Sequence, residues 1–506
     1  MRTWDGWGAI PPKSRRLPNS ANVQEASPMR HPLRQVFAAL EKVASNSPLG
    51  ILSRRIRRRG WWGLAVFLLS FILAVGTAIP PAVSQESPEV IDWSEQIIQF
   101  ERNWEEQYET YFEGDLAAVT LDGDDITQIL AQIARETGTR PAVLWVAPQA
   151  EFLKLALAMP GQPATGRVIP GVTREQMGAV AGEFRRELTH PIRRQTLSYL
   201  PSAQQLYRWI VAPFEAELEA GAIDTLLLCL GPGLRTLPIA AFHDGERFLV
   251  EKYSLTRIPA FNLFNPDRGS FQNVKILAMG ASEFEVLNPL PAVPVELSAI
   301  VGGEAETESG GDRWRPWPGE SFLNGEFTLE NLKRGVASGS FAIVHLATHA
   351  EFQPGKPENS YIQLWDTRLG LDRIGEVDWS GSQTEVLVLS ACQTAVGDTN
   401  AELGFAGLAL KSGVKAAVAS LWSVSDEGTL ALMSDFYRQL RRMPMKAEAL
   451  RRTQMAMING EVRLEGGELL TSWGGVSLPP ILAQMGDRNL SHPFYWAGFT
   501  TVGNPW

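Results

Sequence analysis

Cysteine is scarce in this chain, which has 506 residues and only two cysteines, Cys229 and Cys392. Two cysteines allow at most one disulfide bridge, and they do not form any of the cysteine-rich patterns that bind structural zinc. The sequence therefore predicts neither a disulfide framework nor a cysteine-based zinc centre. Cys229 lies within the apolar run Leu226–Leu230, where we expect a small buried side chain.

Basic residues are scarce beyond residue 60. Residues 1–60 contain 12 Lys/Arg and 3 Asp/Glu, whereas the rest of the chain contains 34 Lys/Arg and 53 Asp/Glu. Because this excess of carboxylates repels phosphate, we expect no nucleic-acid binding by the large C-terminal part. The sequence also lacks a 34-residue periodicity, which argues against tetratricopeptide repeats. We predict no cofactor.

One long uncharged segment is present near the N-terminus. Trp61–Ile79 is mostly apolar, has 19 residues and follows the basic run Arg54–Arg59. Its length and flanking charges predict a membrane-spanning helix, with residues 1–60 as a disordered cytoplasmic tail and the large domain outside the membrane. A cleaved signal peptide is an alternative, because Ala82–Ser84 has the spacing of a cleavage site. A buried helix in a cytoplasmic protein is the third possibility.

The remaining chain reads as three further regions. Residues 80–116 form a linker and an amphipathic helix, Trp93–Phe112, with aromatic residues at spacings of three and four. Residues 117–222 form a smaller α/β subdomain, in which we find no candidate nucleophile. Residues 223–506 alternate strands and helices, which predicts an α/β fold with a mainly parallel sheet flanked by helices. The predicted core strands are Thr225–Leu230, Lys275–Gly280, Ala342–Ala347, Glu385–Ser390 and Ala416–Ser420.

Two short motifs each consist of an apolar run that ends in a reactive side chain. Phe341–Phe352 contains His349, and Val386–Asp398 contains Cys392. Both runs have the pattern of buried parallel strands, and in an open α/β sheet the chemistry lies outside the carboxyl ends of the strands. We therefore expect His349 and Cys392 at the same edge of the sheet, where the imidazole would generate the thiolate nucleophile.

These motifs resemble those of the caspase-like peptidases. Ser390–Thr394 keeps the central Ala-Cys-Gln of the caspase signature, in which the histidine lies about 50 residues upstream. The flanking residues are similar to one branch, the bacterial CHAT domains, with their forms VHLATHGxF and LSACQTxxGD. The resemblance covers most of Asp224–Gly503. Further similar segments are Gly233–Gly245, Phe322–Lys333, Ala401–Gly407, Val418–Asp426 and His492–Phe499.

The resemblance implies a site. Cys392 would be the nucleophile and His349 its base, and the backbone N–H groups of Ala350 and Cys392 would bind the oxyanion. The family usually has glycine at the position of Ala350, so alanine would be strained if φ there were positive. Asp398, Trp422 and Asp426 are candidate substrate-binding residues, with helix capping or core packing as the alternative for each.

Other histidines suggest structural roles. His345 and His349 lie on one side of a strand but about 13 Å apart, which is too far for one metal ion unless the chain turns between them. We therefore predict no metal site and expect His345 to be a hydrogen-bonded structural residue. His243 lies in Phe242–Gly245, which reads as a turn.

Three functions remain open from the sequence. The first is an exported or membrane-anchored cysteine endopeptidase that hydrolyses a protein or peptide partner through Cys392 and His349. The second is a non-catalytic CHAT module for interaction or regulation, which the Ala350 substitution leaves open. The third is an acyl transferase that uses the same thiol. The sequence predicts no oligomeric state.

Overall fold

The computed structural model describes residues 91–116, 120–267, 274–302, 316–379, 383–390, 392–394, 398–443, 445–472 and 474–506. The chain divides into two compact units, Met1–Glu89 and Val90–Trp506, and all described residues belong to the second. The predicted segment Trp61–Ile79 lies outside them. Within the described residues, no helix has both the length and the apolar character that crossing a bilayer requires.

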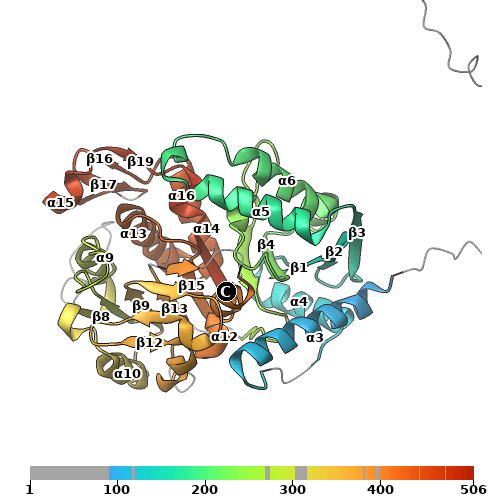
Figure 1. The fold of residues 1–506 in the computed structure, drawn as a ribbon, viewed down its shortest axis with the longest axis horizontal. Coiled ribbons are helices and arrows are strands. Elements are labelled where there is room, and N and C mark those ends of the chain that lie inside the picture. Colours follow the sequence, from blue (N-terminus) through green and yellow to red (C-terminus); the bar gives the residue numbers. More distant parts are fainter. Residues whose placement is uncertain are drawn as a thin grey trace, which may run out of the picture. The chain divides into compact units, whose positions relative to one another are not determined.

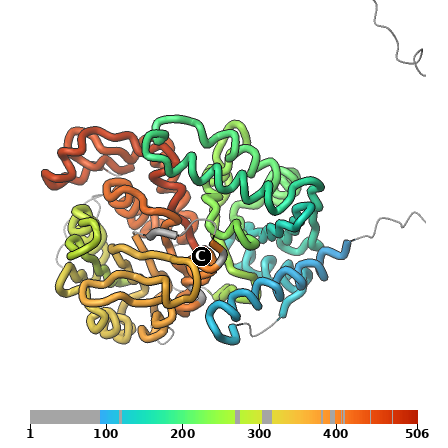
Figure 2. The backbone as a smooth tube through the Cα atoms, in the orientation of Figure 1, coloured from blue at the N-terminus to red at the C-terminus, as the bar shows by residue number. Residues whose placement is uncertain are grey.

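A twelve-stranded, mainly parallel sheet runs through the second unit (Figures 1 and 2). Only three neighbouring pairs are antiparallel: β1 with β2, β2 with β3, and β15 with β20. In spatial order the strands are β3 (Thr165–Pro170), β2 (Phe152–Ala158), β1 (Pro141–Pro148), β4 (Thr225–Leu230), β5 (Ser254–Ile258), β20 (Phe499–Gly503), β15 (Ala416–Ser420), β13 (Val386–Leu389), β9 (Ile343–Ala347), β6 (Ile276–Gly280), β8 (Trp317–Leu323) and β7 (Val301–Gly302).

Helices cover both faces of the sheet around β1. Alternate residues of β1 point to opposite faces, so Val143 and Trp145 join one apolar cluster and Leu144 and Val146 another. The first cluster includes side chains of α3 (Trp93–Phe112) and α4 (Gly123–Thr137). The second includes α5 (Arg174–Thr189), α6 (Leu200–Ile210) and α7 (Glu215–Ala220). The predicted helix Trp93–Phe112 is confirmed.

The predicted core strands all form, each within one residue of its expected ends. Figure 1 shows α9 (Val293–Ile300) and α13 (Asp426–Arg442) on one side of β9 and β13, with α10 (Leu329–Ala337) and α12 (Leu408–Ser412) on the other. α14 (Lys446–Ile458) packs on α13. The remaining helices are α8 (Leu249–Lys252), α11 (Thr399–Ala406), α15 (Pro480–Ala483) and α16 (Pro493–Trp496).

Two stretches with a helical sequence pattern, Gly404–Ser412 and Ala203–Leu218, are interrupted in the structure. Gly404–Ser412 is divided between α11 and α12 at Gly407, where a side chain would collide with the ring of Phe112 and with the carbonyl of Leu403. Ala203–Leu218 is divided between α6 and α7 at Pro213, which lacks the N–H that a continuous helix needs. Proline chemistry explains the second break, and the first lies where close packing leaves room only for glycine.

Two smaller sheets lie outside the main one. The first has the order β12 (Arg368–Gly370), β11 (Tyr361–Gln363), β10 (Ala350–Phe352) and β14 (Cys392–Thr394). The second has the order β18 (Gly474–Ser477), β17 (Glu468–Thr471), β16 (Arg463–Glu465) and β19 (Arg488–Asn489). The first sheet contains the candidate nucleophile and therefore belongs to the site.

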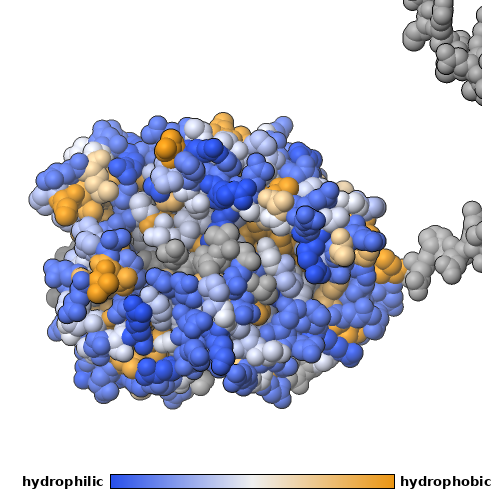
Figure 3. All heavy atoms as spheres, in the orientation of Figure 1, coloured by the Kyte–Doolittle hydropathy of each residue, from blue (hydrophilic) through white to orange (hydrophobic). Residues whose placement is uncertain are grey.

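The face drawn in Figure 3 is mainly hydrophilic, with hydrophobic residues scattered over it rather than gathered in one broad patch. Among the described residues, the most exposed large hydrophobic side chain is that of Val286, which is 91% exposed. Isolated exposed apolar residues are common on protein surfaces, and Val286 is one of them, on the loop that follows β6.

Candidate active site

Parallel strand pairing brings the backbones of His349 and Cys392 together. β9 and β13 are neighbours in the main sheet, and His345 pairs with Val388 in their register. The chain then continues from β9 into β10 and from β13 into β14, which are again parallel neighbours. In that second pairing Ala350 lies directly opposite Cys392. The backbone of Ala350, the residue after His349, therefore lies beside that of Cys392.

His349 is half-buried against the loop that follows β6. Its Nε2 lies 2.8 Å from the carbonyl oxygen of Asn288, and its ring meets that of Phe284 edge to face with centroids 4.8 Å apart. A carbonyl oxygen only accepts hydrogen bonds, so Nε2 must carry the proton. In the neutral imidazole, Nδ1 then has no proton and can act as a base.

The loop Ala281–Ala292, which supplies these contacts, is closed at its base. The N–H of Ala281 bonds to the carbonyl of Ala347 at the end of β9 (3.1 Å), and the N–H of Leu290 bonds to the carbonyl of Ser282 (2.9 Å). A cavity of about 460 Å³ lies beside the loop, lined by its residues 283–287 and by Gln363, Trp365 and Arg368. The chain thus forms a pocket next to the residue that contacts His349.

His345 is fully buried in β9. Its Nδ1 is 3.0 Å from the hydroxyl of Tyr437, and its Nε2 is 3.1 Å from a carboxylate oxygen of Glu296, without hydrogen-bond alignment. Burial raises the pKa of Tyr437 well above its usual value. In the part of the chain that is described, no three His, Cys, Asp or Glu side chains are grouped so that they could hold a metal ion.

Two carboxylates stabilise α11, the helix that follows the segment of Cys392. Asp398 caps the N-terminus of α11, accepting hydrogen bonds from the N–H groups of Asn400 and Ala401 at 3.0 and 2.9 Å. Glu402, in the same helix, accepts a 2.8 Å hydrogen bond from the N–H of Gly233, and burial raises its pKa. α11 is thereby tied to the loop that follows β4. The predicted substrate contact of Asp398 stays a prediction.

Trp422 and Asp426 lie on the segment that follows β15. Trp422 is only 5% exposed and donates its indole N–H to the carbonyl of Phe494, so it has little surface for a ligand. Asp426 is the first residue of α13, and one of its carboxylate oxygens accepts the N–H of Ala292 at 2.7 Å. Burial raises the pKa of Asp426 to about 7. Their substrate-binding roles remain predictions.

Cys229 and His243, which the sequence analysis also considered, are not part of the candidate site. Cys229 is fully buried in β4, and burial raises its pKa well above the usual thiol value. His243 lies in a turn, where its Nδ1 accepts the N–H of Gly245 at 3.0 Å. Burial lowers the pKa of His243.

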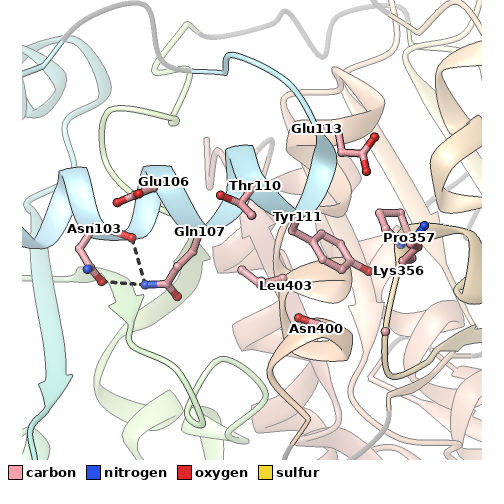
Figure 4. A pocket seen from close by; sticks show the side chains of 11 residues that line it. Asn103, Glu106, Gln107, Thr110, Tyr111, Glu113, Lys356, Pro357, Asn400 and Leu403 are labelled. Atoms are coloured by element: carbon pink, nitrogen blue, oxygen red, sulfur yellow. Dashed lines mark hydrogen bonds between the residues drawn. The ribbon is translucent and has the colours of Figure 1, made fainter.

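A second cavity, of about 570 Å³, adjoins the segments that follow β10 and β14 (Figure 4). Its wall is the polar side of α3, which includes Gln107 and Thr110, and it faces Lys356 and Asn400. The Gln107 amide donates to the carbonyl and side-chain oxygens of Asn103 at 3.0 and 2.7 Å. The cavity is therefore bordered by hydrogen-bonding groups from three distant parts of the sequence.

Comparison with known proteins now places the chain in a family. The profile of the CHAT domain matches residues 200–504, more than half of the sequence, so the chain belongs to the CHAT domain family. No curated protein matches it. Similar solved structures include a separase in complex with securin and the RgpB protein in complex with its pro-domain.

Two of these structures show how low the sequence identity to solved structures is. The Saccharomyces cerevisiae separase of a separase–securin complex is 10% identical with a TM-score of 0.41, over 75% of this chain and 31% of the separase. The RgpB protein of Porphyromonas gingivalis, solved as a complex of its pro- and mature domains, is 9% identical with a TM-score of 0.36, over 66% of this chain and 77% of RgpB. The chain therefore spans about a third of the separase it matches.

Sequence reasoning missed the contacts that surround His349. Asn288 acts through its backbone carbonyl, which every residue has, so no residue type signals the role. Phe284 lies 65 residues upstream of His349 in a loop without a repeating pattern. The density of Pro and Asn in 288–294 marks a turn-rich segment, but not its position over the imidazole.

Proposed function

We propose that this chain is a caspase-like cysteine endopeptidase in which Cys392 and His349 hydrolyse peptide bonds of a protein partner. The observation that carries the proposal is the register that sets Ala350 opposite Cys392 on parallel strands, directly after His349. CHAT membership supports the same reaction class. The intact cysteine and histidine favour a catalytic domain over a non-catalytic module, which would be free to lose either residue.

The contact between His349 and Asn288 supports a role for His349 as the general base. The bond from Nε2 to the carbonyl of Asn288 leaves Nδ1 as the atom that takes the proton of the Cys392 thiol. The thiolate attacks the carbonyl carbon of the substrate, and a carbon–sulfur bond forms as the carbonyl π electrons move to oxygen. The imidazolium then returns its proton to the amide nitrogen as the carbon–nitrogen bond breaks. Water, activated by the same imidazole, hydrolyses the thioester.

Backbone direction supports an oxyanion role for Ala350. The N–H of Gln363 bonds to the carbonyl of His349 at 2.8 Å, so His349 directs its backbone groups toward β11. Because successive residues of a strand direct these groups to opposite sides, the N–H of Ala350 is directed toward β14, the strand of Cys392. Donors that already face the developing charge are worth about 10²–10³ in rate.

The test uses the purified protein and a panel of peptidyl electrophiles, with the adduct located by mass spectrometry. We expect a single adduct on Cys392, loss of cleavage and labelling in Cys392→Ala, and loss of cleavage with slow residual labelling in His349→Ala. Cys229→Ala is the matched control and should keep near-normal activity, since Cys229 is buried and its pKa is raised. Partner binding that survives Cys392→Ala, without any cleavage by the unsubstituted protein, would instead indicate a non-catalytic module.

We further propose that the domain works outside the cytoplasmic membrane, either anchored by Trp61–Ile79 or released by cleavage after Ser84. The support is the sequence alone: an uncharged segment of 19 residues behind a basic run. Reporter fusions after Ser84 and at the C-terminus should both report export. A cytoplasmic signal from either fusion would contradict this location.

A further inference from the structure

The loop Ala281–Ala292 contacts the imidazole of His349, and its downstream end is bonded to another helix. Phe284 and Asn288 contact the imidazole, and α9 begins five residues after Asn288. Ala292 is the capping position of α9, but its own side chain provides no cap. An N-terminal N–H without a partner would leave the start of this helix free to fray.

Asp426 supplies the missing acceptor from α13. Its carboxylate accepts the N–H of Ala292 at 2.7 Å, so one side chain joins the N-terminal ends of α9 and α13. The helical hydrogen bonding of α13 itself is begun by Ser425, whose hydroxyl accepts the N–H of Gly428. Asp426 is therefore not needed as the cap of its own helix.

We propose that Asp426 is a positioning residue for His349, which holds Ala292 and thereby keeps the carbonyl of Asn288 on Nε2. This inference deepens the proposed peptidase function and rests on it for the effect on rate, but the geometry of His349 can be tested separately. The bond from Asp426 to Ala292 lies at one end of the loop and the bond from Nε2 to Asn288 near its middle. Loss of the first should loosen the second.

The surroundings of Asp426 favour its uncharged form. Asp426 is bordered by Glu296 of α9 and Glu427 of α13, and Glu427 is ion-paired with Arg488. Two carboxylates nearby and extensive burial disfavour a charged Asp426, and the N–H of Ala292 is the hydrogen-bond donor that the structure gives it. An asparagine has the same shape and keeps an oxygen acceptor, so it should preserve the contact.

The experiment compares Asp426→Ala with Asp426→Asn in the purified protein. Histidine-labelled NMR reports the tautomer of His349, whose signal is assigned by its absence in His349→Ala, and a peptide reporter gives kcat and KM. We expect Asp426→Ala to lose the pure Nε2–H tautomer and to lower kcat about tenfold or more with KM changed less than about twofold. Asp426→Asn should keep the tautomer and stay within about threefold of the parent kcat.

A matched control separates positioning from general loss of stability. Asp435 is a buried carboxyl on the same helix, but it accepts hydrogen bonds from Ser472 and Gln439, away from the loop. Asp435→Ala should therefore leave the His349 tautomer unchanged. An unchanged tautomer and kcat in folded Asp426→Ala, or the same tautomer change in Asp435→Ala, would overturn the inference.

A second variant tests the bond from its other side. Ala292→Pro removes the N–H and leaves Asp426 intact; proline adopts the φ of −80° found at Ala292, and circular dichroism checks that the variant is folded. We expect the same tautomer change as in Asp426→Ala, and a parent-like tautomer would overturn the inference even if Asp426→Ala does not fold. A tautomer change in a protein that cleaves nothing would support the positioning role while contradicting the proposed peptidase.

Discussion

Ala350 departs from the family pattern, because the family usually has glycine at this position. The sequence leaves open a strained alanine, because the position is usually glycine. The non-glycine residues with positive φ in the described part of the chain are Glu113, Ala222 and Asn324, and Ala350 lies in β10. Alanine therefore fits its backbone here without strain, and it keeps the N–H that an oxyanion would need.

This argument predicts the effect of two substitutions at Ala350. Ala350→Gly should change kcat/KM by no more than about threefold, because the N–H and the extended backbone are both retained. Ala350→Pro removes the N–H and should lower kcat by about 10²–10³. Circular dichroism and electrophile labelling of Cys392 would check that the second variant is folded. Equal activity of the proline variant would exclude the N–H as a donor.

At the scale of elements, helices and strands with a regular apolar pattern could be predicted from the sequence, whereas irregular segments could not. The buried runs of β4, β6, β9, β13 and β15 and the aromatic stripe of α3 are local patterns, so their prediction succeeded. β20 follows the α16 segment without a distinct signal, and its antiparallel place beside β15 is set by tertiary packing. The loop over His349 depends on backbone contacts, which sequence patterns do not encode.

The attachment of α3 to the sheet contains a buried carboxyl. Glu101 is fully buried, accepts the indole N–H of Trp145 at 2.6 Å and the N–H of Asn262 at 2.9 Å, and has its pKa raised to about 7 by burial. A carboxyl whose pKa is higher in the folded state stabilises the protein most below its unfolded pKa of 4.5, and that contribution disappears as the pH rises through 7.

Glu101→Gln should therefore weaken the pH dependence of stability. We expect the free energy of unfolding of the parent protein to fall between pH 5 and pH 8 by up to about 3 kcal/mol more than that of the variant. Urea denaturation at both pH values measures the difference. Glu106→Gln, on the exposed side of the same helix, is the control and should behave as the parent. Identical pH dependence in parent and Glu101→Gln would contradict the prediction.

At the scale of the whole molecule, the two α/β regions share one sheet. The predicted boundary at residues 222 and 223 falls just before β4, which pairs with β1 over six residues from Pro141–Thr225 to Val146–Leu230. β4 is buried along its whole length. Phe112 of α3 also packs closely on Gly407, between α11 and α12, so the N-terminal region contacts the segment that follows Cys392.

A fragment of residues 223–506 should therefore not fold on its own. Removing β1 exposes the unpaired edge of β4, and removing α3 to α7 exposes the apolar faces that they cover, both of which promote aggregation. We expect residues 90–506 to be soluble with a cooperative thermal transition, and residues 223–506 to be insoluble. Co-expression with residues 90–222 as a separate chain should restore solubility, because β1 can then pair with β4. A soluble 223–506 fragment that unfolds cooperatively would show instead that the caspase-like core is independent of the region before it.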